Sequence, residues 1–354
     1  MADKFIKSIT FVKGGDAYYP LPKVTNADDG KVLKVVDGAW SVTDLVPPPY
    51  LSFLGNEDFT LKTYNTTKNW DGTLEYSTDK STWNTWDGNE ISSSGSKLYL
   101  RGTGNTRITG NGNDYRFVFT GTDTLKIACE GNIENLLDYE TVSAGGHPTM
   151  ISYCYRSIFY GCTSLTTAPE LPATMLATSC YEYMFYGCTS LTTAPALPAT
   201  TLADYCYCYM FCGCTALTTA PELPETTLAG NCYRYMFKNC TSLTTAPALP
   251  ATTLAGNCYS NMFNGCTSLT TTPTLPATTL AVFCYQNMFD GCTNIKLSTT
   301  QTEEYHTAYR IPTSGTGKTA LKALQDMFAN TGGTFTGTPE INTTYYLSTS
   351  NTVV

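Results

Sequence analysis

A 26-residue repeat occupies the middle of the chain and constrains its fold more than any other feature. Near-identical blocks open at cysteines spaced 26 residues apart, namely Cys154, Cys180, Cys206, Cys232, Cys258 and Cys284. Repeats of about 20–50 residues are typical of stacked architectures, in which each unit buries its apolar face only against its neighbours. The sequence therefore predicts a solenoid of six repeats.

The apolar residues of the second block predict a short helix from Cys180 to Cys188. At about 100° per residue, one side of this helix would be buried and would carry Cys180, Tyr181, Met184, Phe185 and Cys188. Gly187 suits the left-handed conformation that ends a helix, and Asn239 replaces it in the fourth block. Leu191–Ala194 then predicts a short strand, which ends at Pro195 because proline cannot donate to a ladder.

The block sequence GCTSLTTAPELP and its copies resemble the leucine-rich repeats of the BspA-like type, whose units follow F-x-x-C-x-x-L. Such repeats occur in surface proteins of gut and oral bacteria and in phages that infect gut bacteria. The resemblance covers about 140 of the 354 residues and implies an α/β solenoid with a role in adhesion. Alanine and proline replace the β-branched strand residues that are usual in the family, so we expect very short strands.

The chain outside the blocks predicts further domains. The expected fold is multi-domain: an N-terminal β module at residues 1–46, a small all-β, sandwich-like domain at 47–130, the leucine-rich-repeat α/β solenoid at 131–300, and a C-terminal cap and tail at 301–354. Pro47, Pro48 and Pro49 form a stiff spacer after the first module. Residues Thr319–Asn330 predict a helix and look like a degenerate seventh repeat.

The first module carries a second resemblance. Residues Ala27–Trp40 resemble a short module found near the N-termini of phage tail and head-fibre proteins; an ordinary β-hairpin is the alternative. Strands are expected at Ile9–Val12 and Val32–Val36, with a turn at Asp37-Gly38.

Composition excludes several classes of function. With 14% charged residues and a net charge of −8, the chain lacks the basic patch that nucleic-acid binding requires. It has no apolar run near the ~18 residues of a membrane span, and its first residues lack the pattern of a secretion signal. We therefore expect no nucleic acid and no membrane span.

The fifteen cysteines are predicted to be reduced. Twelve form pairs at i and i+8, about 12 Å apart on a helix, which is too far for a disulfide and unlike a zinc spacing. They are best interpreted as buried thiols that act as small apolar residues. Cys208 and Cys212 are the exceptions, because both fall on the predicted outer face.

No catalytic set, cofactor motif or metal cluster stands out, so we expect no enzyme, no cofactor and no metal. Ser314–Thr319 imitates a phosphate loop, but Pro312 stands where the pattern requires glycine. Three tryptophans, Trp70, Trp83 and Trp86, are either core residues or a sugar-stacking platform.

These features favour a virion structural appendage, a tail or head fibre that binds host surfaces. The expected partners are other virion proteins through residues 1–46 and a host-surface glycan or protein, with a homo-trimer possible; the expected location is the virion, after assembly in the host cytoplasm. The alternatives are a bacterial BspA-like cell-surface adhesin and a cytoplasmic protein-interaction scaffold.

Positions that differ among the blocks indicate where a partner would bind, because shared positions serve the shared fold. The candidate partner-binding residues are Tyr160, Glu182, Tyr183, Tyr186, Tyr209, Arg234, Tyr235 and Lys238. Tyr183, Tyr209 and Tyr235 are expected to stack in one column, with Tyr160 and Tyr186 beside it. Two alternatives remain: these positions vary because nothing selects them, or the partner binds the uniform threonine face that includes Thr193 and Thr219.

Overall fold

The structure is a computed structural model that describes residues 31–36, 39–44, 48–66, 68–112 and 115–354. The contacts divide the chain into two compact units, Met1–Pro47 and Pro48–Val354. In the first unit, β1 (Lys31–Val36) and β2 (Ala39–Asp44) form an antiparallel hairpin. The predicted strand at Ile9–Val12 and the turn at Asp37-Gly38 lie outside the described residues.

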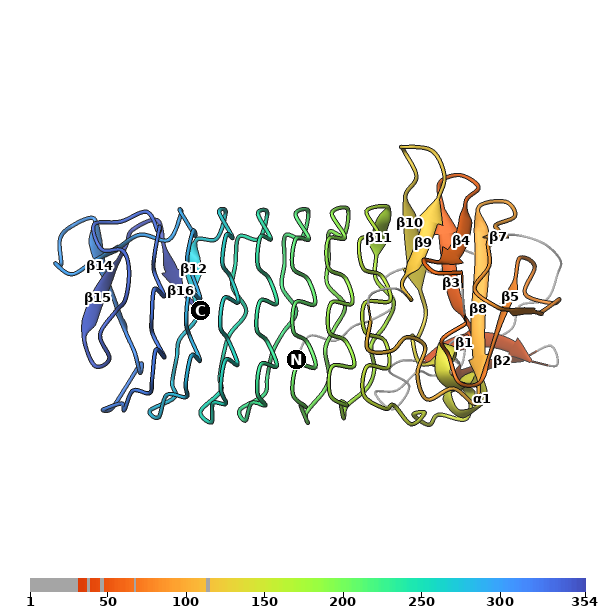
Figure 1. The fold of residues 1–354 in the computed structure, drawn as a ribbon, viewed down its shortest axis with the longest axis horizontal. Helices are drawn as coiled ribbons and strands as arrows, with labels where there is room; N and C mark the ends of the chain where they lie inside the picture. The colour runs from red at the N-terminus through yellow and green to blue at the C-terminus, as the bar shows by residue number, and fades with distance from the viewer. Residues whose placement is uncertain (1–30, 37–38, 45–47, 67, 113–114) are drawn as a thin grey trace. The chain divides into compact units, whose positions relative to one another are not determined.

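The second unit begins with two sheets (Figure 1). One has the strand order β11-β10-β3-β8-β5-β6 and the other β7-β4-β9. Their bounds are β3 Leu51–Gly55, β4 Thr60–Thr63, β5 Thr73–Ser77, β6 Asn84–Trp86, β7 Ile91–Ser92, β8 Lys97–Thr103, β9 Phe117–Thr120, β10 Ile127–Glu130 and β11 Leu165–Thr167. Phe53 of β3 contacts Phe117 and Phe119 of β9, with ring centroids 6.1 and 5.2 Å apart, so the two sheets share one core.

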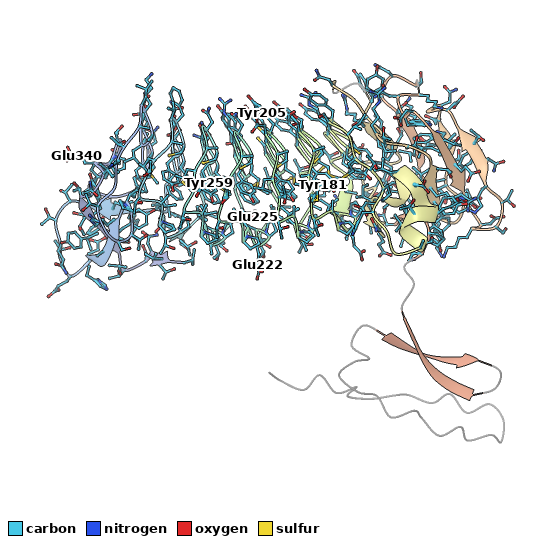
Figure 2. The ribbon with its side chains drawn as sticks, turned by 90° about the horizontal axis from the view of Figure 1, so that it is seen from below. Tyr181, Tyr205, Glu222, Glu225, Tyr259 and Glu340 are labelled. Atoms are coloured by element: carbon cyan, nitrogen blue, oxygen red, sulfur yellow. The ribbon has the colours of Figure 1, made fainter. Side chains whose placement is uncertain are left out.

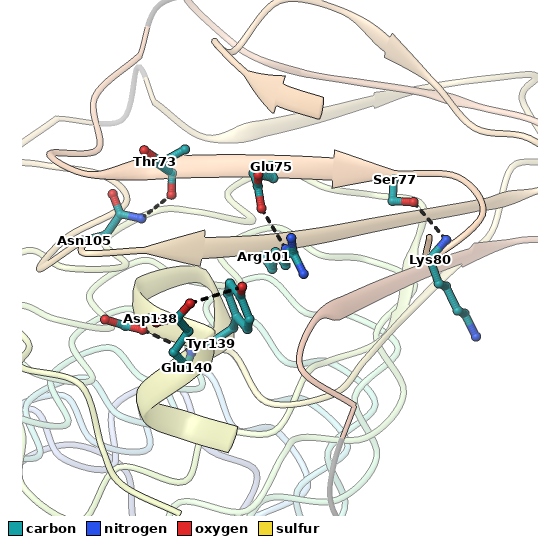
Figure 3. A network of polar contacts seen from close by, with 9 residues as sticks. All are labelled: Thr73, Glu75, Ser77, Lys80, Arg101, Asn105, Asp138, Tyr139 and Glu140. Carbon is teal, nitrogen blue, oxygen red and sulfur yellow. Dashed lines mark hydrogen bonds and ion pairs between the residues drawn. The ribbon is translucent and has the colours of Figure 1, made fainter. Parts of the chain in front are cut away.

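Within the described part of the chain, the one α-helix is α1 (Asn135–Ser143), and it packs on β8. Arg101 of β8 joins the two elements (Figure 3). Its Nε donates to Glu75 Oε2 at 2.7 Å, and its guanidinium carbon lies 4.4 Å from the ring centroid of Tyr139 on α1. The predicted helices of the repeats and of Thr319–Asn330 are therefore wrong, and so is the α/β description of the repeat region.

In place of a helix, each block forms a chain of tight turns in which every fourth residue is left-handed. In the second block these residues are Ser179, Tyr183 and Gly187, with φ of 54°, 58° and 69°. Asn239 has φ 59° where the other blocks have glycine, as expected. A four-residue period also places i, i+1, i+4 and i+5 on one side, which explains why the buried face was predicted correctly from a helical wheel.

The backbone groups of the turns alternate between local and inter-repeat hydrogen bonds. The amides of Tyr181, Tyr183 and Phe185 donate to the carbonyls of the next repeat, 25 residues onward, at 2.9–3.0 Å. The intervening amides, such as those of Glu182 and Met184, donate to the residue three positions earlier. This pattern pairs the buried peptide groups without a regular helix or strand.

Side chains inside the stack form parallel columns. Cys180, Tyr181, Met184, Phe185 and Cys188 are each at most 1% exposed, as are their five equivalents in the next repeat. The second cysteine of each block is more than a small apolar residue. Its thiol donates to a phenylalanine carbonyl of the preceding repeat; Cys188 and Cys214 do so to Phe159 and Phe185 at 3.1 Å.

The opposite side of each block is extended but barely forms strands. Single parallel bridges join Thr193 to Thr219 and Thr219 to Thr245. The expectation of very short strands is confirmed, because β11 and β12 (Thr271–Thr272) are the named strands of this ladder.

Both ends of the stack are covered. At the first end, β10 pairs with β11, and Phe117 packs on Phe159 with ring centroids 5.8 Å apart. At the other end, the backbone amides of Tyr285 and Phe289 donate to the carbonyls of Ala323 and Met327. Residues near 319–330 therefore continue the ladder as the degenerate seventh repeat that was predicted.

Four more strands complete the C-terminal end, where β15 pairs with β13 and β14, and β16 pairs with β12. Their bounds are β13 Leu297–Ser298, β14 Tyr305–Arg310, β15 Thr344–Ser348 and β16 Thr352–Val353. The division of residues 47–354 into three domains stays a prediction. Within the described ranges, no helix has the length and apolar character needed to span a bilayer.

Candidate interaction surface

The tyrosines at the variable positions lie together on one side of the stack. We call Tyr160, Tyr183, Tyr186, Tyr209 and Tyr235 the tyrosine strip, and each is half-buried. The predicted stacking is confirmed: ring centroids are 4.6 Å apart for Tyr183–Tyr209, 4.3 Å for Tyr209–Tyr235 and 4.7 Å for Tyr160–Tyr186, with interplanar angles of 3–14°. Because each ring covers the face of the next, the strip is a rigid aromatic surface.

Three of these tyrosines occupy a strained backbone position. Tyr183, Tyr209 and Tyr235 have φ of 57–58°, and Asn261 and Asn287 take the same conformation one and two repeats later. A left-handed backbone costs about 1–2 kcal/mol for most residues and less for asparagine. The fold is thus served better by asparagine here, so the rings are not explained by the backbone.

The charged candidates lie beside the rings. Arg156 Nε donates to Glu182 Oε2 at 2.9 Å, and the two side chains are 15% and 12% exposed. Arg234 and Lys238 flank Tyr235, with Cζ and Nζ 4.9 and 5.3 Å from its ring centroid. The structure thus brings all eight predicted residues to one side of repeats one to four.

Burial and charge also act on the strip's own hydroxyls. Burial, and then the nearby Glu182, raise the pKa of Tyr183 to about 12. Its phenol therefore stays protonated and keeps its hydrogen-bond donor throughout the neutral range.

Cys208 and Cys212 occupy the positions of Glu182 and Tyr186 on the predicted outer side, but neither thiol is exposed there. They are 2% and 4% exposed, because a thiol is short and the longer side chains of the adjacent repeats extend past it. Burial raises the pKa of both thiols, that of Cys212 to about 11. Since the thiolate is the metal ligand and nucleophile, neither cysteine is poised for such chemistry. All fifteen cysteines are free and buried.

The sugar-stacking interpretation of the tryptophans is also wrong for two of them. Trp70 and Trp86 are 4% and 1% exposed and stack on each other at 5.4 Å inside the core. Trp83 is partly exposed, but its ring is covered by the Arg101 guanidinium at 4.1 Å.

The threonine face, the alternative binding surface, is exposed at Thr193, Thr219 and Thr245. Shallow hollows lie between successive proline-containing segments beyond it. One has a volume of about 390 Å³ and is lined by Pro195, Pro221 and other alanine, leucine, proline and glutamate residues. This face is nearly the same in every repeat, so it offers little that distinguishes one partner from another.

Sequence reasoning missed a glutamate–histidine pair near the first repeat. Glu134 Oε2 lies 2.7 Å from His147 Nδ1, and the Glu134 side chain is 1% exposed. Burial raises the pKa of this carboxyl. A cavity of about 400 Å³ adjoins both residues. Across the described ranges, no three His, Cys, Asp or Glu side chains are grouped to hold a metal ion.

Comparison with protein families identifies the repeats. The family model described as BspA type leucine rich repeat region matches residues 146–269 and 204–307, in six copies. The finding supports a BspA-like leucine-rich repeat protein. BspA-like repeats suggest a role in surface adhesion or protein interaction. The comparisons with curated proteins and with solved structures found no match.

One repeat departs from the others inside the stack. Glu225 replaces the alanine of the other repeats, is 8% exposed, and accepts a hydrogen bond from the Tyr233 hydroxyl at 2.6 Å. Figure 2 labels Glu225 among the side chains of the repeats. Burial raises the pKa of this carboxyl above its ordinary 4.5, and the Tyr233 hydrogen bond opposes the increase.

A raised pKa in the folded state means that the native protein binds the proton more tightly than the unfolded chain. The contribution of Glu225 to stability is therefore full below its unfolded pKa and is lost as pH rises through the folded pKa. We expect the free energy of unfolding of Glu225→Ala to increase relative to that of the parent as pH rises from 4 to 8, because the parent loses the contribution of Glu225 over this range. Urea unfolding at both pH values measures this, and a difference that does not change with pH would contradict it.

Proposed function

We propose that this BspA-like protein is a host-recognition appendage of a phage virion, a tail or head fibre. In this proposal residues 1–46 attach the chain to the particle, and a solenoid of 26-residue repeats binds the host surface through the tyrosine strip.

The backbone strain of Tyr183, Tyr209 and Tyr235 is the observation that carries the recognition role. Every fourth residue of each block is left-handed, so what distinguishes the strip is the choice of tyrosine at three such positions. Asn261 and Asn287 adopt the same φ in the same fold, so tyrosine is not required there. Tyrosine supplies a large contact area at a low entropic cost, which favours a binding surface.

The separateness of the first unit supports the attachment role. Met1–Pro47 is compact on its own contacts and contains the β1–β2 hairpin, which overlaps the segment Ala27–Trp40 that resembles the phage module. Pro47, Pro48 and Pro49 follow it, and proline-rich segments act as semi-rigid spacers. A unit attached in this way can be held by a particle without disturbing the repeats.

The bacterial cell-surface adhesin accounts for the repeats equally well, and the two proposals differ in where the protein is found. We expect purified virions to contain the full chain and a chain lacking residues 1–46 to be left out of particles while still folding, because Pro48–Val354 is a compact unit. Quantitative mass spectrometry of particles and circular dichroism of the free protein measure both. Incorporation of the truncated chain at the normal copy number would contradict the attachment role.

A further inference from the structure

The tyrosine strip ends abruptly between the fourth and fifth repeats. Tyr235 stacks on Tyr209 at 4.3 Å, but the equivalent position one repeat onward is Asn261. Asparagine side chains then take over this side of the stack. The junction therefore places the last ring of an aromatic column beside shorter polar groups.

The free positive charge of the repeats lies at this junction. Residues 154–293 contain three cationic side chains, Arg156, Arg234 and Lys238. Arg156 is neutralised by Glu182. Among the ion pairs of the described residues, none involves Arg234 or Lys238. In a chain of net charge −8, two adjacent unpaired cations are a local exception.

The Arg234 guanidinium is held in place but incompletely bonded. Its Nε is buried and has no hydrogen-bond partner within the structure. A buried donor without a partner destabilises the folded chain, so a small movement of the Arg234 side chain that brings its Nε to a ligand acceptor would be favourable. Guanidinium groups match carboxylates and phosphates with two parallel hydrogen bonds, and a neighbouring ammonium adds a second charge.

The neighbouring amides indicate what else the ligand contains. Asn264, Asn287 and Asn330 all donate to Asp290, at 2.8–3.4 Å. Their donors occupy Asp290, and among the ion pairs of the described residues none joins Asp290 to Arg234 or Lys238. Amide oxygens remain available to hydroxyl donors. An aromatic ring, free cations and amides together suit a hydroxyl-rich ligand that carries an anionic group.

We propose that Arg234, Tyr235 and Lys238 form the binding site for an anionic sugar unit of a surface polysaccharide. The carboxylate or phosphate of the sugar is bound by Arg234 and Lys238, its apolar face packs on the edge of the Tyr235 ring, and its hydroxyls reach the partly exposed Asn261 amide. This site rests on the proposed recognition function and specifies the class of ligand.

Binding of the full chain to defined probes tests the site. The probes are oligogalacturonate, its neutral methyl ester, a phosphorylated mannan and polyglutamate, measured by isothermal titration calorimetry. We expect binding to one or both anionic sugars, and binding weaker by about tenfold or more in Arg234→Gln/Lys238→Gln. The control Lys296→Gln/Lys318→Gln removes the same charge outside the strip and should bind like the parent.

Tyr235→Asn should also weaken binding, because asparagine is the natural residue at this position one repeat later. Equal binding of the neutral ester, tighter binding of polyglutamate, or no binding of either anionic sugar would overturn the site. A host-cell binding assay distinguishes failure of the anion site from failure of the proposed recognition function. If the Arg234→Gln/Lys238→Gln protein binds cells normally and only the tyrosine variants fail, the anion site is wrong and the recognition surface stands.

Discussion

The triple variant Tyr183→Asn/Tyr209→Asn/Tyr235→Asn is expected to lose host-cell binding by about tenfold or more while unfolding at or slightly above the parent's temperature. Stacked rings provide most of the contact area of the strip, so their removal leaves a partner little to pack on. Stability is preserved because asparagine relieves left-handed strain, which offsets the lost stacking of about 0.5–1.5 kcal/mol per pair. Flow cytometry with labelled protein and thermal denaturation measure the two outcomes.

The matched control changes the opposite face. Thr193→Lys/Thr219→Lys/Thr245→Lys places three long charged side chains across the exposed threonine ladder. This variant should bind cells like the parent. Loss of binding in the threonine variant alone would move the recognition surface to the threonine face, and unchanged binding in both would exclude both faces.

Phe211→Ala is expected to cause the largest loss of stability of any single substitution proposed. Phe211 is fully buried and stacks between Phe185 and Phe237, with ring centroids 5.6 and 5.7 Å away. Truncation removes its buried apolar surface and leaves a cavity, which costs about 3–5 kcal/mol in well-packed cores. The ladder on both sides prevents the repeats from closing the gap, so we expect the upper part of this range.

Tyr209→Asn is the control for this substitution, because it removes a ring of similar size two residues away but outside the stack. Its effect on the free energy of unfolding should stay below about 1 kcal/mol. Urea denaturation followed by far-ultraviolet circular dichroism compares the two. Equal effects would show that the inner phenylalanine column does not dominate the stability of the repeats.

The sequence alone predicted which side chains of the repeats are buried better than it predicted the backbone conformation. Cys180, Met184 and Cys188 recur every four residues, and a helix of 3.6 residues per turn places them on one side almost as well as a four-residue turn does. Period alone therefore could not distinguish the two conformations. The left-handed residues carried the missing signal: Asn231, Asn257 and Asn261, with one glycine in each block but the fourth, at Gly187 and its equivalents, mark turns rather than a helix.

The candidate surface was predictable where its residues recur at the 26-residue spacing of the blocks. Tyr183, Tyr209 and Tyr235 are spaced 26 residues apart, so their stacking follows from the stacking of the blocks, and the Arg156–Glu182 pair could have been found by the same rule. Cys208 lies on the predicted side but is covered, because the pattern gives a direction and not the length of neighbouring side chains. The Glu134–His147 contact joins non-repetitive segments, for which the sequence offers no register.

The hydrogen bonds between turns have a consequence for how such a chain can change over generations. Each repeat presents the same carbonyls to the preceding repeat and the same amides to the next, 25 residues onward. Recombination that adds or deletes whole 26-residue units therefore creates no mismatched interface, whereas loss of one residue from a turn would leave a ladder of donors out of register. The length of the recognition surface can thus be altered in single genetic steps, with the terminal elements unchanged.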